Sequence, residues 1–371
     1  MVVALFAGVR SCSSSGGDDA DGAGSTEAVE AATEADDGED AEDTDVEEAD
    51  ADADDADAEQ TAASAYSSDV EEALATCTAW DSPSTADFSD IAQDEEATGV
   101  VGFSLSGDEA PSLSIANIVA LSEALSPYVQ ADVPYGFIVM DLETGRGFAC
   151  NLDSEVYGAS SFKAALCTYL GQNVVDTGDY SLESTVTNLA ESTSGSYVSS
   201  GVATISSLIE NAIVYSSNAS YLSLRNTVDD DDLAAWLEGI DADSDIAYDT
   251  SFPHYTARDA ARMWLTIYEY WDEGTDTASL IEQSCADTET SFLRDALEGT
   301  GVEVRDKAGW NADGDSDDGV DYNAIVDNGI VTCNGRDYLM CVMLGATYAD
   351  STVERAETLM KVVFDLHEDL A

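Results

Sequence analysis

Positive charge is scarce in this sequence. Its 371 residues include three lysines and two histidines, and 12 basic residues face 77 acidic ones, for a formal net charge of −65. Such a chain is a poor partner for nucleic acid or for an anionic lipid surface. The excess of acid instead indicates salty or extracellular surroundings, where counter-ions screen the repulsion between carboxylates.

Long apolar runs and metal-ligand motifs are also missing. No apolar run reaches about 18 residues, so the folded part has no predicted membrane span. No Cys-x-x-Cys motif or Cys/His cluster is present, and we expect neither a metal nor a cofactor. The two histidines, His254 and His367, have no matching partners and are predicted to be surface or loop residues. That shortage disfavours a Ser-His-Asp triad.

The cysteines beyond Cys12 are even in number, which favours structural disulfides. The alternative is a set of buried free thiols in a reducing compartment. The six residues are Cys77, Cys150, Cys167, Cys285, Cys333 and Cys341.

The first hundred residues have little core-forming pattern. Residues 1–12, "MVVALFAGVRSC", resemble a truncated lipoprotein signal in which Cys12 would carry a lipid, the one expected link to a membrane. Arg10 and the missing basic region depart from such signals, so a start upstream of Met1 is an alternative. Residues 13–65 are an acidic low-complexity linker, and 66–110 are a poorly defined lead-in with one short helix expected at 67–77. We expect an extracytoplasmic protein, secreted or anchored at the cell surface.

Clear periodicity marks a folded domain over residues 111–371. Apolar residues from Ile115 to Leu125 predict a helix that ends before Pro127. The segment 135–152 predicts a β-hairpin around "ETG", and helical spacing follows from "SSFKAALCTYL". A mostly helical stretch occupies about 180–300.

Strand patterns return near the C-terminus. "VEVRDKAGW", "YNAIVDNGIVTC" and "DYLMCVMLGAT" read as three strands, the last two joined by "NGR", and a helix with an apolar stripe closes the chain. Together the elements predict an α+β fold: an antiparallel five-stranded sheet flanked by helices, an α/β sandwich, with an all-helical subdomain. We expect a site where these two parts meet.

Three short motifs carry candidate chemistry. Ser160 stands three residues before Lys163, so the two share a helix face. "VYSSNAS" supplies Ser216 and Asn218, and "DKAGW" supplies Lys307 with the residues that follow it. Two of the three lysines thus fall within motifs. A serine needs a base to become a nucleophile, and a lysine serves as that base only when burial or a second cation lowers its pKa.

With this order of motifs, the chain resembles the serine β-lactamase and penicillin-binding protein superfamily, most closely its class A β-lactamase-like branch. The resemblance covers roughly residues 112–371 and implies the β-lactamase/transpeptidase-like fold. It also implies a monomer that acts on a small β-lactam or a peptidoglycan-derived peptide.

The resemblance assigns roles to individual residues. Ser160 would form the acyl-enzyme with Lys163 as general base, while Ser216 would relay a proton to the leaving nitrogen. Asn218 would orient the lysine and the substrate amide, and Lys307 would attract the substrate carboxylate. Substrate would lie against Gly309, and the oxyanion hole would come from the backbone N–H groups of Ser160 and Trp310.

Two departures from the family pattern leave the function open. Ala308 replaces the usual hydroxyl residue of the third motif, and no Glu-x-x-Leu-Asn loop is present to activate the deacylating water. Asp245 or Asp249 is a substitute that spacing does not select. The alternatives are a D-Ala-D-Ala peptidase or penicillin-binding protein with slow deacylation, a serine glutaminase, or a non-catalytic surface binding protein that keeps the fold.

Overall fold

The structure is a computed structural model, and it describes residues 86–88, 91, 99–187, 201–312 and 320–370. The signal-like segment, the acidic linker and the helix expected at 67–77 lie outside these residues, as do Cys12 and Cys77. Within the described residues, no helix is both long and apolar enough to cross a membrane.

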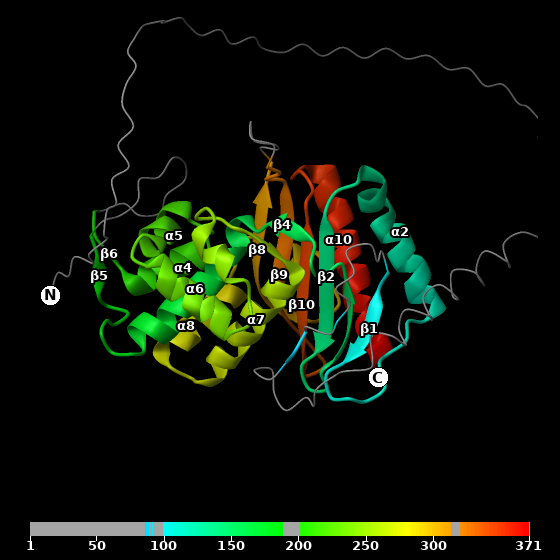
Figure 1. The fold of residues 1–371 in the computed structure, drawn as a ribbon, viewed down its shortest axis with the longest axis horizontal. Coiled ribbons are helices and arrows are strands. Elements are labelled where there is room, and N and C mark those ends of the chain that lie inside the picture. The colour runs from blue at the N-terminus through cyan, green and yellow to red at the C-terminus, as the bar shows by residue number, and fades with distance from the viewer. Residues whose placement is uncertain (1–85, 89–90, 92–98, 188–200, 313–319, 371) are drawn as a thin grey trace, which may run out of the picture. The chain divides into compact units, whose positions relative to one another are not determined.

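An antiparallel sheet of six strands lies at the centre of the fold (Figure 1). In spatial order the strands are β1 (Val101–Ser104), β3 (Arg146–Cys150), β2 (Tyr135–Asp141), β10 (Arg336–Leu344), β9 (Ala324–Cys333) and β8 (Glu303–Asn311). The prediction of five strands was one short, because β1 comes from the lead-in before residue 111. Its four residues are all buried, so the sequence "VGFS" has no alternation of apolar and polar positions to reveal it.

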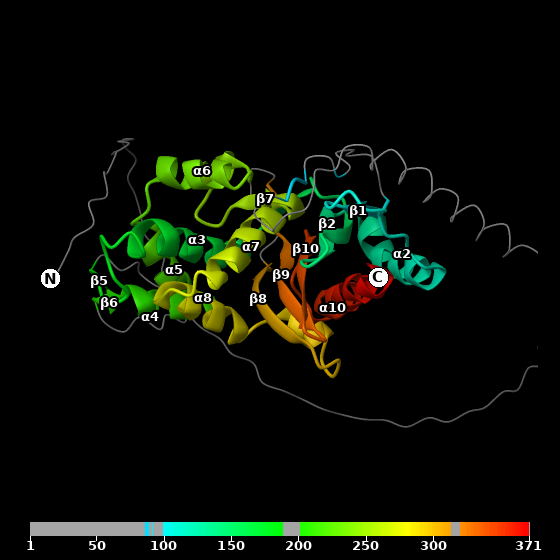
Figure 2. The same ribbon diagram turned by 90° about the horizontal axis from the view of Figure 1, so that it is seen from below.

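Helices cover both faces of this sheet. The helices are α2 (Ile115–Ala131), α3 (Lys163–Leu170), α4 (Ile205–Ile213), α5 (Asn218–Arg225), α6 (Asp230–Gly239), α7 (Ala257–Asp272), α8 (Asp276–Ala286), α9 (Phe292–Ala296) and α10 (Asp350–Asp365). Figure 2 shows α2 and α10 against one face and α7 against the other, with the remaining helical subdomain beyond α7. The α+β prediction with a helical subdomain is therefore confirmed.

Shorter elements complete the chain. They are the pair β4 (Glu155–Tyr157) and β7 (His254–Thr256), the pair β5 (Thr185–Val186) and β6 (Ala203–Thr204), the 3₁₀ turns η2 (Ala159–Phe162), η4 (Ser244–Tyr248) and η5 (Leu366–Leu370), and the π turn η3 (Gly171–Val175). The β4–β7 pair positions the Ser160 motif, because β4 leads directly into η2.

Both predicted hairpins are confirmed. Asn334 and Gly335 join β9 to β10 with φ angles of 53° and 78°, the two positive values that a tight type I′ turn requires. The closing helix α10 also forms, with Ala356, Met360 and Val363 buried in the core.

Helix α2 continues through Pro127 to Ala131, so the prediction that it ends before the proline was wrong. A proline inside a helix removes one backbone hydrogen bond. Here Leu121, Leu125 and Tyr128 are all buried and lie along one stripe, and their burial outweighs the lost bond. The helix ends instead at Asp132, which adopts a left-handed conformation with φ of 53°.

All five described cysteines are free thiols, so the preference for disulfides among them was wrong. Cys150 belongs to the core beneath α2 and α10, whereas Cys167, Cys285 and Cys341 belong to the core on the α7 side. Cys333 lies at the β9–β10 turn. The four buried cysteines act as small apolar groups, a common role for cysteine.

Candidate functional site

Ser160 lies on η2, between β4 and α3, in a turn with unusual backbone geometry. Ala159, the residue before it, has a φ of 46°, which is strained for a residue with a side chain. The turn is fixed by the Gly158 N–H, which donates to the Pro253 carbonyl at 2.9 Å. As the second residue of a 3₁₀ turn, Ser160 has a backbone N–H without a partner inside the turn, available for a ligand oxygen.

The two neighbouring serines of "ASSF" differ in availability. Ser161 is buried, donates to the Gly158 carbonyl at 2.5 Å and accepts from the Tyr255 hydroxyl. Ser160 is only half-buried, and within the described residues its hydroxyl has no hydrogen-bond partner. The structure therefore leaves Ser160 as the serine free to react.

Lys163 begins α3 one turn after Ser160 and is fully buried. Its Nζ donates to the Ser216 carbonyl at 2.6 Å, to the Ser216 hydroxyl at 3.2 Å and to Asn218 Oδ1 at 2.7 Å. The first two motifs therefore meet. Within the described residues, the hydrogen bonds of Lys163 Nζ do not include one to Ser160 Oγ, one turn away.

Ser216 and Asn218 occupy the junction of α4 and α5. Ser216 has a φ of 51°, the second strained non-glycine residue at this site. Ser217 holds the junction, because its side chain caps α5 by accepting from the Ser220 N–H at 3.2 Å. This turn aims both the carbonyl and the hydroxyl of Ser216 at one ammonium group.

Lys307 lies in the middle of β8 and is also buried, with 1% of its surface exposed. Its Nζ donates to the Ala308 carbonyl at 2.8 Å and lies 5.9 Å from the centre of the Trp310 ring. Ala308 itself is fully buried in the core on the α9 side, and its part in substrate binding stays a prediction. Trp310 is half-buried and packs against Phe292.

Gly309 brings β8 against the serine turn. A Cβ at this position would lie 2.4 Å from the Gly158 carbonyl oxygen, 2.7 Å from the Ser161 nitrogen and 3.0 Å from the Ser160 nitrogen. All three are backbone atoms that no rotamer change can move. Glycine is therefore required for the close approach of β8 to Ser160.

Opposing effects act on the pKa of each of the two lysines. Burial lowers the pKa of Lys163 well below its usual range, and the neighbouring Lys307 lowers it further. The three oxygen acceptors around Lys163 act in the other direction, because they match the three N–H donors of an ammonium. Burial also lowers the pKa of Lys307, to about 8, against the opposing pull of Asp327 and Asp306. Burial therefore lowers the pKa of both amines.

Two aromatic rings also lie near the Lys163 ammonium. The ring centres of Tyr221 and Phe252 lie 5.7 Å and 5.6 Å from Nζ. Phe252 belongs to the segment where the family resemblance calls for a glutamate loop. Asp245 is exposed, while Asp249 accepts from the His254 backbone N–H at 2.8 Å. Within the described residues, neither aspartate contacts Lys163.

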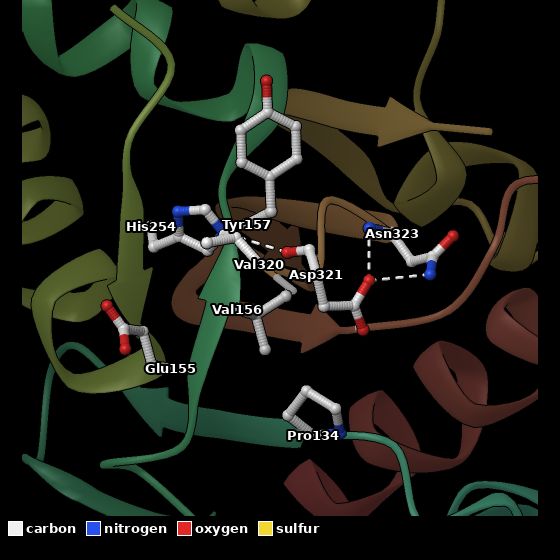
Figure 3. Close-up of a pocket in the computed structure, with 9 residues that line it drawn as sticks. Pro134, Glu155, Val156, Tyr157, His254, Val320, Asp321 and Asn323 are labelled. Atoms are coloured by element: carbon white, nitrogen blue, oxygen red, sulfur yellow. Dashed lines mark hydrogen bonds between the residues drawn. The ribbon is translucent and has the colours of Figure 1, made fainter. Parts of the chain in front are cut away.

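His254 lies in strand β7 rather than in a loop, and it is half-buried. It lines a cavity of about 200 Å³ with Tyr157, Asp321 and other residues (Figure 3). Its Nε2 bonds the Asp321 carbonyl at 2.9 Å, and its Nδ1 lies 3.3 Å from Asp249. Neither ring nitrogen contacts a described serine. His367 lies in η5, with its ring stacked on Phe364.

The motif search missed several residues at this site. Tyr255, Tyr221 and Phe252 gave no signal, because aromatic residues are ordinary in a core. Asp306 and Asp327 gave a weak signal, since each puts a charged residue inside a strand that reads as buried on both faces. Within the described residues, no cluster of His, Cys, Asp and Glu could hold a metal ion.

Comparison with known proteins agrees with this arrangement. A model of the "Beta-lactamase enzyme family" matches residues 120–366, more than half of the chain. The chain belongs to the β-lactamase enzyme family. No curated protein matches it.

Solved structures of PBP-A and of a β-lactamase share the fold. PBP-A is 17% identical with a TM-score of 0.56, over 68% of this chain and 97% of that one. A leucine-to-glutamate variant of PBP-A, in an acyl-enzyme complex with penicillin G, is 18% identical with a TM-score of 0.55 over the same shares. A β-lactamase from Chitinophaga pinensis DSM 2588 is 15% identical with a TM-score of 0.56, over 67% of this chain and 99% of that one. At these identities the likeness shows the fold alone.

Proposed function

We propose that this family member is a serine hydrolase that forms an acyl-enzyme on Ser160 from β-lactams or related amides, including peptidoglycan-derived peptides. The observation that carries the proposal is the meeting of the three motifs around Lys163. The fully buried Lys163 donates hydrogen bonds to Ser216 and Asn218 and lies one turn from the half-buried Ser160. The charge of Lys307 lowers its pKa further. Buried lysines with a lowered pKa are typical bases for nucleophilic catalysis.

The proposed acylation begins with Lys163 as a neutral amine. It takes the proton of the Ser160 hydroxyl as Oγ bonds to the substrate carbonyl carbon, and the carbonyl oxygen becomes an oxyanion. The backbone N–H groups of Ser160 and Trp310 stabilise that charge. The C–N bond then breaks, and the Lys163 proton reaches the leaving nitrogen through the Ser216 hydroxyl, to which Lys163 already donates at 3.2 Å.

Lys307 supplies substrate attraction in this scheme. The buried ammonium offers a positive charge beside Trp310 and the Gly309 strand edge, where a substrate carboxylate would lie. A charge held in a low-dielectric site attracts an anion far more strongly than one in water.

Release of the acyl group is proposed to be slow, as in a penicillin-binding protein or D-Ala-D-Ala peptidase. Phe252 favours this second candidate, because it places a ring beside Lys163 on the segment where a class A enzyme is expected to carry a glutamate. PBP-A, which this chain resembles in fold, forms an acyl-enzyme with penicillin G as a glutamate variant. The lifetime of the acyl group therefore separates a β-lactamase from a slowly turning-over relative.

The direct test is mass spectrometry after incubation with a fluorescent penicillin. We expect one adduct, mapped to the peptide that contains Ser160, in wild type and none in Ser160→Ala. Ser122→Ala changes an exposed serine on α2 and should retain the adduct. The mass of the adduct followed over time gives its lifetime, and nitrocefin turnover measures hydrolysis. If saturating penicillin leaves no adduct and nitrocefin stays intact, the proposal is wrong. A non-catalytic binding protein would then be favoured.

A further inference from the structure

His254 joins two segments that border the proposed site. It lies in β7, directly after the loop of residues 249–253. Its Nε2 lies 2.9 Å from the Asp321 carbonyl oxygen (Figure 3), and Asp321 belongs to the connection between β8 and β9. A carbonyl oxygen can only accept, so Nε2 carries the hydrogen of this bond. The imidazole ring thus bridges β7 to the end of the sheet.

The Asp321 end of this bridge is firmly held. The Asp321 carboxylate accepts from the backbone N–H of Asn323 at 2.8 Å and from its side-chain amide at 2.7 Å, as Figure 3 shows. The adjacent Tyr322 carbonyl accepts from the Asn311 side chain, at the end of β8, at 2.8 Å. His254 is therefore bonded to a segment that is tied to β8 as well as to β9.

The His254 ring itself has little freedom to move. Asp249 Oδ2 accepts the His254 backbone N–H at 2.8 Å and lies 3.3 Å from Nδ1. The ring centre lies 5.1 Å from that of Tyr157 and 5.3 Å from that of Tyr322. Only 15% of the side chain is exposed. Contacts at both nitrogens and beside the ring fix its place.

The strand that His254 fixes is also the strand that holds the serine turn. His254 pairs with Tyr157 in the β4–β7 ladder, and the Pro253 carbonyl accepts the Gly158 N–H at 2.9 Å. The next residue, Ala159, has the left-handed φ of 46°, a conformation that persists only where surrounding contacts hold it. If Pro253 loosened, the turn could relax and Ser160 Oγ would move.

We propose that His254 is a positioning residue for Ser160: its hydrogen bond to the Asp321 carbonyl holds β7 in place, and β7 holds the strained serine turn in its reactive geometry. This inference rests on the proposed function for the reaction that Ser160 performs. A displacement of about 1 Å at a reacting atom can slow a reaction by about 10²-fold.

Two amide variants test the bond to Asp321. Glutamine places an N–H donor near the position of Nε2, whereas asparagine is too short to reach Asp321. In stopped-flow fluorescence with a fluorescent penicillin, His254→Asn should lower the maximal acylation rate by about 10- to 100-fold and leave the half-saturating concentration within about twofold. His254→Gln should restore the rate to within about threefold of wild type. His367→Asn replaces the other histidine, on η5, and should acylate like wild type.

Hydrogen exchange reports on the serine turn without any reaction. The Gly158 N–H is protected by its bond to Pro253. The peptide that spans residues 155–162 should therefore exchange faster in His254→Asn than in wild type or His254→Gln. This measurement does not need an adduct, so failure of the proposed function and failure of this inference give different results.

Several outcomes would overturn the inference. Wild-type acylation and exchange in His254→Asn would mean that the ring does not hold the turn. An equal loss in His254→Gln would mean that the bond to Asp321 does not matter. A slower rate with unchanged exchange, or a change in half-saturation alone, would mean that His254 acts by another route. If His254→Asn does not fold, Asn323→Ala loosens Asp321 from the far side, and unchanged exchange there would equally contradict the proposal.

Discussion

The two faces of strand β8 differ in how they hold charge. The site face, toward η2 and α8, carries Lys307, and near it the buried Lys163 of α3 is surrounded by neutral oxygens and aromatic rings. The back face, toward α9, carries the buried pair Asp306 and Asp327. In a chain with 77 acidic residues, the two carboxyl groups that raise the pKa of Lys307 are fully buried on that back face. Negative charge there can balance an ammonium without repelling an anionic substrate.

Loss of Lys163 should reduce the rate of acylation more than any other change on the site face. Lys163→Ala removes the proposed base, so we expect acylation by penicillin to slow by about 10²- to 10⁴-fold. Lys361→Ala removes an exposed lysine and should acylate at the wild-type rate. Stopped-flow fluorescence gives both rates, and thermal unfolding monitors folding. A near-normal rate in folded Lys163→Ala would assign the base to another residue.

A methyl group at Gly309 should push β8 away from the serine turn. Gly309→Ala places a Cβ 2.4 Å from a backbone oxygen, so we expect a loss of about 1–3 kcal/mol in unfolding free energy. Acylation should slow as well, because the Ser160 backbone must shift. Gly239→Ala adds the same methyl group into open space on α6 and is the matched control. Equal stability of the two variants in urea unfolding would contradict the close approach.

The two lysines should give acylation a bell-shaped pH dependence. The base must be neutral, so the rate rises with pH through the lowered pKa of Lys163. Lys307 must be charged, so the rate falls as pH rises through about 8. On each limb we expect the acylation rate to change by about tenfold per pH unit. A matched amide substrate without a carboxylate should keep the acid limb and lose the alkaline one. An alkaline limb for both substrates would argue against Lys307 as the carboxylate partner.

A carboxylate placed beside Lys163 should shorten the acyl-enzyme lifetime. Phe252→Glu puts an acid on the loop whose ring now lies 5.6 Å from Nζ, where it can act as a base toward water. We expect deacylation to quicken by about tenfold or more. Phe252→Gln has the same shape without the charge and controls for loss of the ring. If the two variants deacylate alike, a missing carboxylate is not what slows release.

More residues of the site face than of the back face could be predicted from the sequence. Ser160, Lys163, Ser216 and Lys307 lie in short motifs whose residue types name their chemistry, and the structure brings Lys163 and Ser216 into contact. The back face depends on pairing between β8 and β9 across the register Ala308 to Asp327, which local spacing does not encode. The path of α2 through Pro127 was missed for a related reason, since burial of Tyr128 in the tertiary core outweighs a local helix-breaking signal.

The smallest effect concerns the cysteines, because we expect a reducing agent to leave the stability of the protein unchanged. Cys150 and Cys341 lie on neighbouring parts of the sheet but in the cores of opposite faces, so their side chains cannot meet. Alkylation of denatured, unreduced protein followed by peptide mapping should label all five described cysteines, and a reducing agent should leave the melting temperature unchanged. A structural disulfide would instead add about 2–5 kcal/mol. If Cys167 or Cys285 stays unlabelled and reduction lowers the melting temperature, a disulfide lies next to Lys163. Packing alone would then not explain how Lys163 is held in place.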